Sequence, residues 1–189
     1  MSTQSTIEQR LERIEVRAEL EDLVTRYSMA VDDRDLDAVL ELFTPDASFG
    51  HRSDPGIVGH EAIRKHYQNR LGGLVYSYHY AHNQLIEWDG GDDAKGEVNA
   101  HAEMAFPGNL VIAALRYHDT YRRVDGVWRF ARRDQSFYYF LPIADMVAGD
   151  YAEGRKRWPG PALDAELPDS LATYDKFLAE MESSGSANG

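Results

Sequence analysis

The hydrophobic pattern of this chain changes its period once, at the dipeptide Gly72-Gly73. Upstream, apolar residues recur every three to four positions, which predicts helices over residues 7–31, 36–43 and 59–71. Downstream, the pattern has the period of strands and predicts them over residues 75–88, 95–106, 110–123 and 128–139. Helices that precede the strands, instead of alternating with them, favour an α+β fold with the helices on one face of a sheet.

Short glycine-containing segments separate the predicted strands. Pro107-Gly108-Asn109 and Asp125-Gly126 are typical of tight hairpin turns, while residues 89–93 form a longer connection. Because a hairpin turn joins antiparallel neighbours, the four long strands are predicted to form an antiparallel meander. One further short strand is predicted over residues 47–51, in the helical half of the chain.

Composition narrows the class of partner. The chain has 189 residues, of which 43% are hydrophobic, enough for one buried core. Its formal net charge of −12 argues against binding to nucleic acid or to an anionic membrane, both of which need a basic face. The absence of cysteine excludes disulfide and thiolate chemistry. Neither a membrane-spanning apolar run nor a secretory signal is visible, so we expect a cytoplasmic protein.

The last fifty residues are predicted to be an extension of the main domain. Pro142, Pro159, Pro161 and Pro168 prevent one long helix there. Apolar residues recur between these prolines, so residues 143–182 are expected to pack on the mouth of the domain or on a neighbouring subunit, with a short helix near 170–181. Residues 183–189 are polar and small, which predicts a disordered tail.

Several stretches resemble one protein family in their order and spacing. They are Tyr27-Ser-Met-Ala-Val-Asp32, Leu42-Phe-Thr-Pro-Asp-Ala47, Gly59-His-Glu-Ala-Ile63, Tyr78-His-Tyr80 and Tyr121-Arg-Arg-Val-Asp-Gly-Val-Trp128. Together they resemble the SnoaL-like branch of the nuclear transport factor 2-like superfamily, over about residues 8–142. The resemblance implies a cystatin-like cone, in which N-terminal helices cover a curved antiparallel sheet, with residues 1–142 as the cone domain. It specifies function less, because this superfamily includes enzymes, binding proteins and transport adaptors.

A narrower resemblance is to the group of scytalone dehydratase, hexachlorocyclohexane dehydrochlorinase and bile-acid dehydratase. It implies that Asp32 and His79 are catalytic, and that Arg133 corresponds to an active-site arginine of the dehydrochlorinase. Tyr27 stands where the dehydrochlorinase has lysine and bile-acid dehydratases have tyrosine, which favours polarising a carbonyl over binding chloride. The resemblance also implies a homo-oligomer, with a trimer favoured over a dimer.

The chemistry of this pair is that of a general base. A neutral imidazole is a good base near pH 7, and a carboxylate that accepts its Nδ1–H fixes the tautomer and stabilises the imidazolium. Asp32 and His79 could supply that pair; alternatively, they are an ordinary helix-end aspartate and a core histidine. Tyr27 could donate a hydrogen bond to a substrate oxygen or simply pack in the core. Arg133 could bind a leaving group, although strict alternation turns it away from Trp128 and Phe130 unless a bulge intervenes.

Strand parity limits the other roles. Side chains alternate along a strand, so Ser77, His79, Ala81 and Asn83 share one face, and His82 lies on the other with Tyr78 and Tyr80. The spacing His79-x-x-His82 is therefore a poor metal site, and no metal is predicted. The aromatic outer face is expected to be the subunit interface. The cavity is expected to be apolar, and its candidate residues, each of which core packing would also explain, are Phe49, His101, Met104, Phe106, Phe137 and Tyr139.

The sequence thus predicts a cofactor-independent lyase of the dehydratase type, acting on a small hydrophobic, aromatic or cyclic substrate. It contains no Gly-x-Gly-x-x-Gly or Walker motif for a nucleotide. Three alternatives stay open: a carbon–carbon lyase that releases formaldehyde from a diaryl compound, a ring cyclase or isomerase, and a non-catalytic protein that binds a small hydrophobic molecule.

Overall fold

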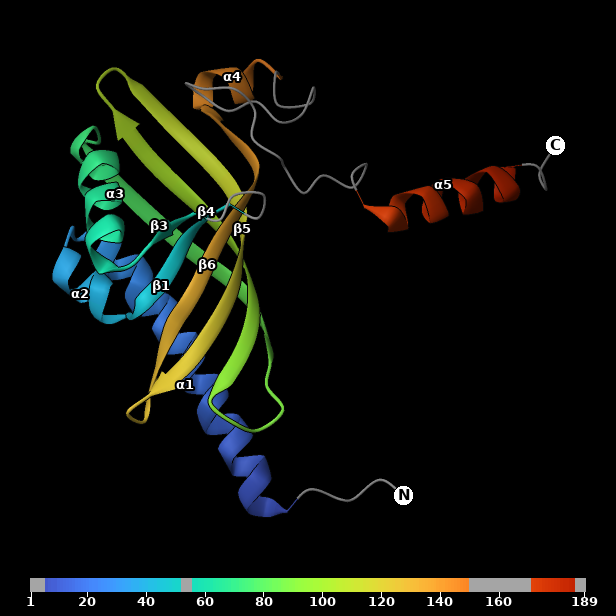
Figure 1. Cartoon of the computed structure of the whole chain (residues 1–189). Helices are drawn as coiled ribbons and strands as arrows, with labels where there is room; N and C mark the ends of the chain where they lie inside the picture. Colours follow the sequence, from blue (N-terminus) through green and yellow to red (C-terminus); the bar gives the residue numbers. More distant parts are fainter. Residues whose placement is uncertain (1–5, 52–55, 150–170, 186–189) are drawn as a thin grey trace.

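A computed structural model describes residues 6–51, 56–149 and 171–185 of the chain (Figure 1). Its elements in chain order are α1 (Ile7–Asp32), α2 (Leu36–Glu41), β1 (Phe43–His51), β2 (Ile57–Val58), α3 (His60–Gly72), β3 (Tyr76–Glu87), β4 (Asp93–Phe106), β5 (Asn109–Val124), β6 (Val127–Pro142), α4 (Ile143–Val147) and α5 (Ala172–Gly185). The predicted α+β order, helices first and long strands afterwards, is confirmed.

The strands form one curved sheet in the order β2-β1-β6-β5-β4-β3, with α1 and α3 on its inner face (Figure 1). Strands β3 to β6 are the predicted antiparallel meander. The sheet as a whole is mixed, because β1 pairs with β6 in parallel beside this antiparallel meander. Strand β1 comes from the helical half of the chain and joins the far edge of the meander, and no turn chemistry in the sequence fixes that direction.

Helix α1 places the end of the first helical segment against the sheet. Thr6 and Gln9 form a capping box at its start. Its buried residues all lie in the last two thirds of the helix, whereas Leu11 and Ile14 near the start are exposed. The helix therefore packs by its C-terminal part, which contacts β3 most and brings Asp32 to the sheet.

The boundary between α2 and β1 differs from the expected one. Asp35 caps α2 through a 3.0 Å bond from the backbone N–H of Ala38, as its position predicts. The helix ends at Glu41, however, and Phe43, expected as its last residue, begins β1. Phe43 is buried against the rings of Tyr27, Phe49 and Phe130. Aromatic packing across the sheet outweighs the weak helical preference of one residue.

Three register shifts within the antiparallel meander decide which of its side chains face inward. The β5–β6 pairing shifts between Thr120 and Tyr121 and again between Ala114 and Leu115, and the β3–β4 pairing shifts between Ala81 and Gln84. Each shift reverses the face of every residue that follows it. The shift between Thr120 and Tyr121 turns Arg133 inward, to the same face as Trp128 and Phe130.

The C-terminal extension is described only in part. Helix α5 runs one turn further than the predicted 170–181, into the segment expected as a disordered tail. The prolines at 159, 161 and 168 lie outside the described residues. That the extension packs on the cone mouth or on a neighbouring subunit therefore stays a prediction. Among the helices described, none is both long and apolar enough to cross a membrane.

Candidate active site

Asp32 and His79 meet at the junction of α1 and β3. The Nδ1 atom of His79 lies 2.6 Å from Oδ1 of Asp32, and the backbone N–H of His79 donates to Oδ2 at 2.7 Å. The hydroxyl of Ser77 donates to Oδ1 at 3.1 Å. These donors offset an unfavourable position, since Asp32 is the last residue of a long helix, where the helix dipole disfavours a carboxylate.

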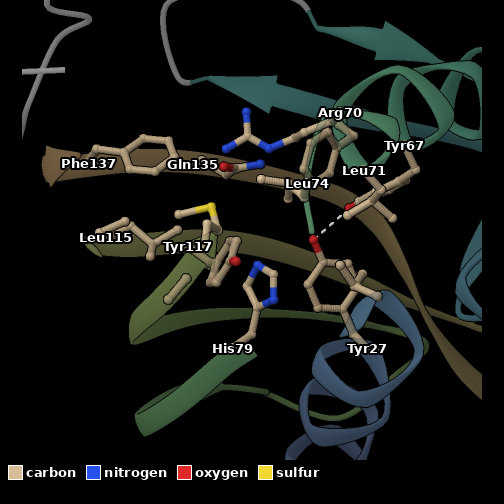
Figure 2. Close-up of a pocket in the computed structure, with 15 residues that line it drawn as sticks. Tyr27, Tyr67, Arg70, Leu71, Leu74, His79, Leu115, Tyr117, Gln135 and Phe137 are labelled. Atoms are coloured by element: carbon tan, nitrogen blue, oxygen red, sulfur yellow. Dashed lines mark hydrogen bonds between the residues drawn. The ribbon is translucent and has the colours of Figure 1, made fainter. Parts of the chain in front are cut away.

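This arrangement fixes the tautomer of the imidazole. A carboxylate can only accept, so the neutral ring carries its proton on Nδ1 and keeps the lone pair on Nε2 free. The His79 side chain is 16% exposed, and its ring points into a pocket (Figure 2). The chain therefore presents an oriented imidazole to that pocket.

The pocket lies between α1, α3 and the concave side of the sheet. Phe49, Met104 and Phe137, predicted as lining residues, line it together with Tyr27 and His79. Apolar and aromatic side chains make up most of the remaining wall. The cavity volume open to the centre of a water-sized molecule is about 30 Å³, room for a few waters. A ring-bearing ligand therefore has to displace side chains when it binds.

Two tyrosine hydroxyls face each other inside the pocket. The hydroxyl oxygens of Tyr27 on α1 and Tyr67 on α3 lie 2.6 Å apart (Figure 2). Burial raises the pKa of Tyr27 well above its usual value, and Tyr67 raises it further. Burial also raises the pKa of Tyr67. Both phenols are neutral at physiological pH, so one proton of the pair can be donated to a bound oxygen.

Arg133 lies behind this wall, not in it. Its guanidinium donates to both carboxylate oxygens of Asp119, at 3.0 and 3.1 Å, and both side chains are fully buried. Its Cζ atom lies 4.2 Å from the ring centre of Tyr27 and 3.9 Å from that of Tyr117. Although burial disfavours the charge, Asp119 and the surrounding phenols raise the pKa of Arg133 overall. Arg133 supports two tyrosines of the pocket and is not one of its lining residues.

Two predicted lining residues belong to the outer face of the sheet. His101 pairs with Ala114 on β5, and so does Tyr139 on β6, and their rings lie 6.4 Å apart. His101 is three residues from the inward Met104, so alternation along β4 turns it outward. Tyr139 is two residues from the inward Phe137, but the register shift between them reverses its face. The expectation that His101 and Tyr139 line the cavity is corrected.

Four polar lining residues were not predicted from the sequence: Tyr67, Arg70, Tyr117 and Gln135. Gln135 is two residues from the predicted lining residue Phe137, a spacing that shares a strand face and could have identified it, and Tyr117 is likewise two residues from Leu115 on β5. Tyr67 and Arg70 are three apart on α3, a spacing that shares a helix face, but only the docking of α3 directs that face at the pocket.

The histidine pattern on β3 gives no metal site. His82 faces outward, as parity predicts, and its Nε2 lies 2.7 Å from Nδ1 of His101. Burial, followed by His82, lowers the pKa of His101. Within the described part of the chain, no three histidine or acidic side chains are grouped as metal ligands.

His66 on α3 is expected to make stability depend on pH. Its ring lies 5.2 Å from that of Phe49, and burial, aided by Arg70 and His51, lowers its pKa to about 4. The unfolded chain has the ordinary value of about 6.5, so it binds the proton more readily. The contribution of neutral His66 is complete above pH 6.5 and is lost as the pH falls through 4.

His66→Phe should therefore reduce the loss of unfolding free energy between pH 6.5 and pH 4, by roughly 1–3 kcal/mol. Urea unfolding at a series of pH values measures this, with the exposed neighbour Lys65→Gln as control. Parallel curves for His66→Phe and the wild type would contradict it.

The chain is similar in sequence to one protein family and to several known proteins. A family model described as a SnoaL-like domain matches residues 12–134. A γ-hexachlorocyclohexane dehydrochlorinase of Sphingobium indicum is 29% identical over 143 residues, which cover 72% of this chain and 89% of the enzyme. An uncharacterised protein of Mycobacterium bovis is 32% identical over 121 residues, or 62% of this chain and 82% of that protein.

A solved structure shares the fold. It is a protein of Novosphingobium aromaticivorans that carries the provisional name scytalone dehydratase, with a TM-score of 0.67 and 19% identity. The match covers 82% of this chain and 95% of that protein. The cone-shaped α+β fold expected from the sequence is therefore confirmed.

Proposed function

Because this chain belongs to the SnoaL-like domain family, we propose that it is a cofactor-independent lyase that eliminates a small molecule from a hydrophobic, aromatic or cyclic substrate. One observation carries the proposal. The 2.6 Å contact between Asp32 and Nδ1 of His79 leaves Nε2 free toward a mostly apolar pocket. The similarity to a dehydrochlorinase, whose name describes the removal of hydrogen chloride, supports an elimination reaction.

The proposed elimination uses the substrate's own atoms. Nε2 of His79 takes a proton from carbon, and the electrons of the C–H bond form the new double bond. The carbon–oxygen bond of the leaving hydroxyl breaks on the neighbouring carbon. The hydroxyl leaves as water after it receives a proton, either directly from the imidazolium or from the Tyr27–Tyr67 pair, to which the imidazolium then returns its proton. Asp32 stays ionised and stabilises the imidazolium while it exists.

The test is a substrate panel followed by mass spectrometry. Small aromatic and cyclic alcohols, halides and hydroxymethyl-bearing diaryl compounds are incubated with the protein in the presence of a chelator. Loss of water or of hydrogen halide supports the proposal. Loss of formaldehyde would identify the carbon–carbon lyase, and a product of unchanged mass the isomerase or cyclase. Binding without turnover of any member would favour the binding protein.

Tyr27→Phe is expected to lower kcat about 10-fold to 1000-fold and to raise KM much less. The phenol acts on a charge that develops in the transition state, so its loss affects turnover more than binding. Steady-state kinetics on a substrate from the panel measures the two effects. Ser28→Ala, on the next residue of α1, is the control. An unchanged kcat with a raised KM would assign Tyr27 to binding alone.

We also propose that the chain forms a homo-oligomer, a trimer in preference to a dimer, through the outer face of β3. Tyr76, Tyr78 and Tyr80 are 37%, 51% and 48% exposed there, an aromatic patch that favours burial. Light scattering at micromolar concentration should give a multiple of 21.4 kDa, and Tyr78→Lys should shift it toward the monomer. Val127→Lys, at an exposed hairpin, is the control. A wild-type monomer would refute this assembly.

A further inference from the structure

The pocket has a charged side chain at its open end. Arg70, in the last turn of α3, lines the pocket and is itself exposed. Its Cζ atom lies 5.9 Å from the ring centre of Phe140, a contact that turns the guanidinium toward β6. Among the described lining residues, Arg70 is the one with a permanent charge.

Arg70 has no internal counter-ion in the described part of the chain. Arg64, also on α3, pairs with Asp37, and the buried Arg133 pairs with Asp119. No carboxylate of the described residues pairs with Arg70. The chain as a whole has a net charge of −12. A cation at the pocket mouth without an internal partner therefore has the opposite sign to the net charge of the protein. Such a cation attracts anionic ligands to a surface that otherwise repels them.

A second polar group accompanies the guanidinium. The side chain of Gln135 on β6 lines the same pocket, and its amide makes no hydrogen bond with the described residues. Figure 2 shows Gln135 and Arg70 on one side of the pocket, with the His79 ring on the other. The field of Arg70 also reaches inward, since it contributes to lowering the pKa of His66 on the same helix.

We infer that Arg70 and Gln135 form a carboxylate-binding subsite, so that the ligand of this pocket is an aromatic or cyclic carboxylate. This inference rests on the proposed function for the site it deepens. The planar guanidinium matches a carboxylate with two parallel hydrogen bonds, and the Gln135 amide supplies a further donor. The ring occupies the apolar space between, and the atoms across from the carboxylate face Nε2 of His79. The subsite thus sets the orientation of the substrate.

Binding measurements test the subsite independently of turnover. Isothermal titration with benzoate, benzamide and acetate separates the contribution of the charge from that of the ring. For the wild type we expect benzoate to bind at least about 10-fold more tightly than either benzamide or acetate, because a charge-assisted pair is added to the buried ring. The preference should decrease with salt, since Arg70 is exposed.

Variants assign the preference to its residues. Arg70→Gln should abolish the difference between benzoate and benzamide and leave the affinity for benzamide unchanged. Arg64→Gln, on the same helix, should change neither. Equal affinity of the wild type for both ligands, no measurable binding of either, or an unchanged preference in Arg70→Gln would overturn the subsite. His79→Ala should keep the preference. A protein that shows this preference but converts none of the panel compounds, tested also in carboxylate-bearing form, refutes the lyase and leaves the subsite standing.

Discussion

His79→Ala is expected to remove nearly all turnover while the protein stays folded. Loss of a general base usually lowers the rate by about 10²–10⁴. Among the described lining residues, no other side chain can replace Nε2 of His79 as the base. The fold should survive, because His79 is partly exposed at the pocket and the Asp32 carboxylate keeps its bonds from Ser77 and from the backbone at residue 79. Steady-state kinetics and circular dichroism measure the two properties separately.

Asp32→Asn should cause a loss of similar size, for a reason that the geometry makes specific. Asp32 accepts three hydrogen bonds and donates none. An amide at this position must turn its NH₂ either toward the backbone N–H of His79, donor against donor, or toward Nδ1. The second choice forces the proton onto Nε2, which is then no longer a base. Asp33→Asn, on the next residue, is the control.

The double variant tests whether the two residues act as one unit. Asp32→Asn combined with His79→Ala should be little slower than His79→Ala alone, because removing the base already removes the function of its partner. Wild-type turnover in His79→Ala on a confirmed substrate would refute the proposed base. Multiplicative losses in the double variant would show that Asp32 acts separately from His79.

The second large effect concerns stability. Asp119→Ala should lower the unfolding free energy by about 3–5 kcal/mol, because it leaves Arg133 buried without a counter-ion. The loss extends to Tyr121, whose hydroxyl donates to Asp119 at 2.8 Å. Urea unfolding of the purified variant measures it. Asp46→Ala, which removes an exposed partner of Arg122, should change stability by less than about 1 kcal/mol.

A compensating double variant separates the charge from the packing. Arg133→Met combined with Asp119→Leu should recover most of the stability lost in Asp119→Ala, since replacing both members of a buried ion pair with apolar groups is often neutral. Some loss should persist, because the guanidinium also contacts the faces of Tyr27, Tyr117 and Phe130. If Asp119→Ala costs no more than Asp46→Ala, the buried pair contributes nothing to stability.

Much of the fold is contained in local sequence patterns. The change of period at Gly72-Gly73, the Asp125-Gly126 hairpin and the cap at Asp35 are set by residues close together in the chain, because backbone preference and side-chain alternation act over a few residues. Asp125 and Gly126 both adopt positive φ, which their two-residue turn requires. Asp32 and His79 were identified differently, by the resemblance to the dehydratase group, since the residues alone also allowed an ordinary helix-end aspartate and a core histidine.

The tertiary structure decided the rest, and the reason is that strand parity can be reset by a single residue. The shift between Ala114 and Leu115 turns Tyr139 outward, and the shift at Thr120 turns Arg133 inward. No local sequence pattern predicts such a bulge, because the free-energy cost of the bulge is offset by packing between strands that are distant in sequence. The direction of β1 and the docking of α3, which brings Arg70 to the same pocket as His79, also depend on such contacts. The sequence by itself identified Asp32 and His79 as a candidate pair, whereas only the assembled cone determined what else surrounds them.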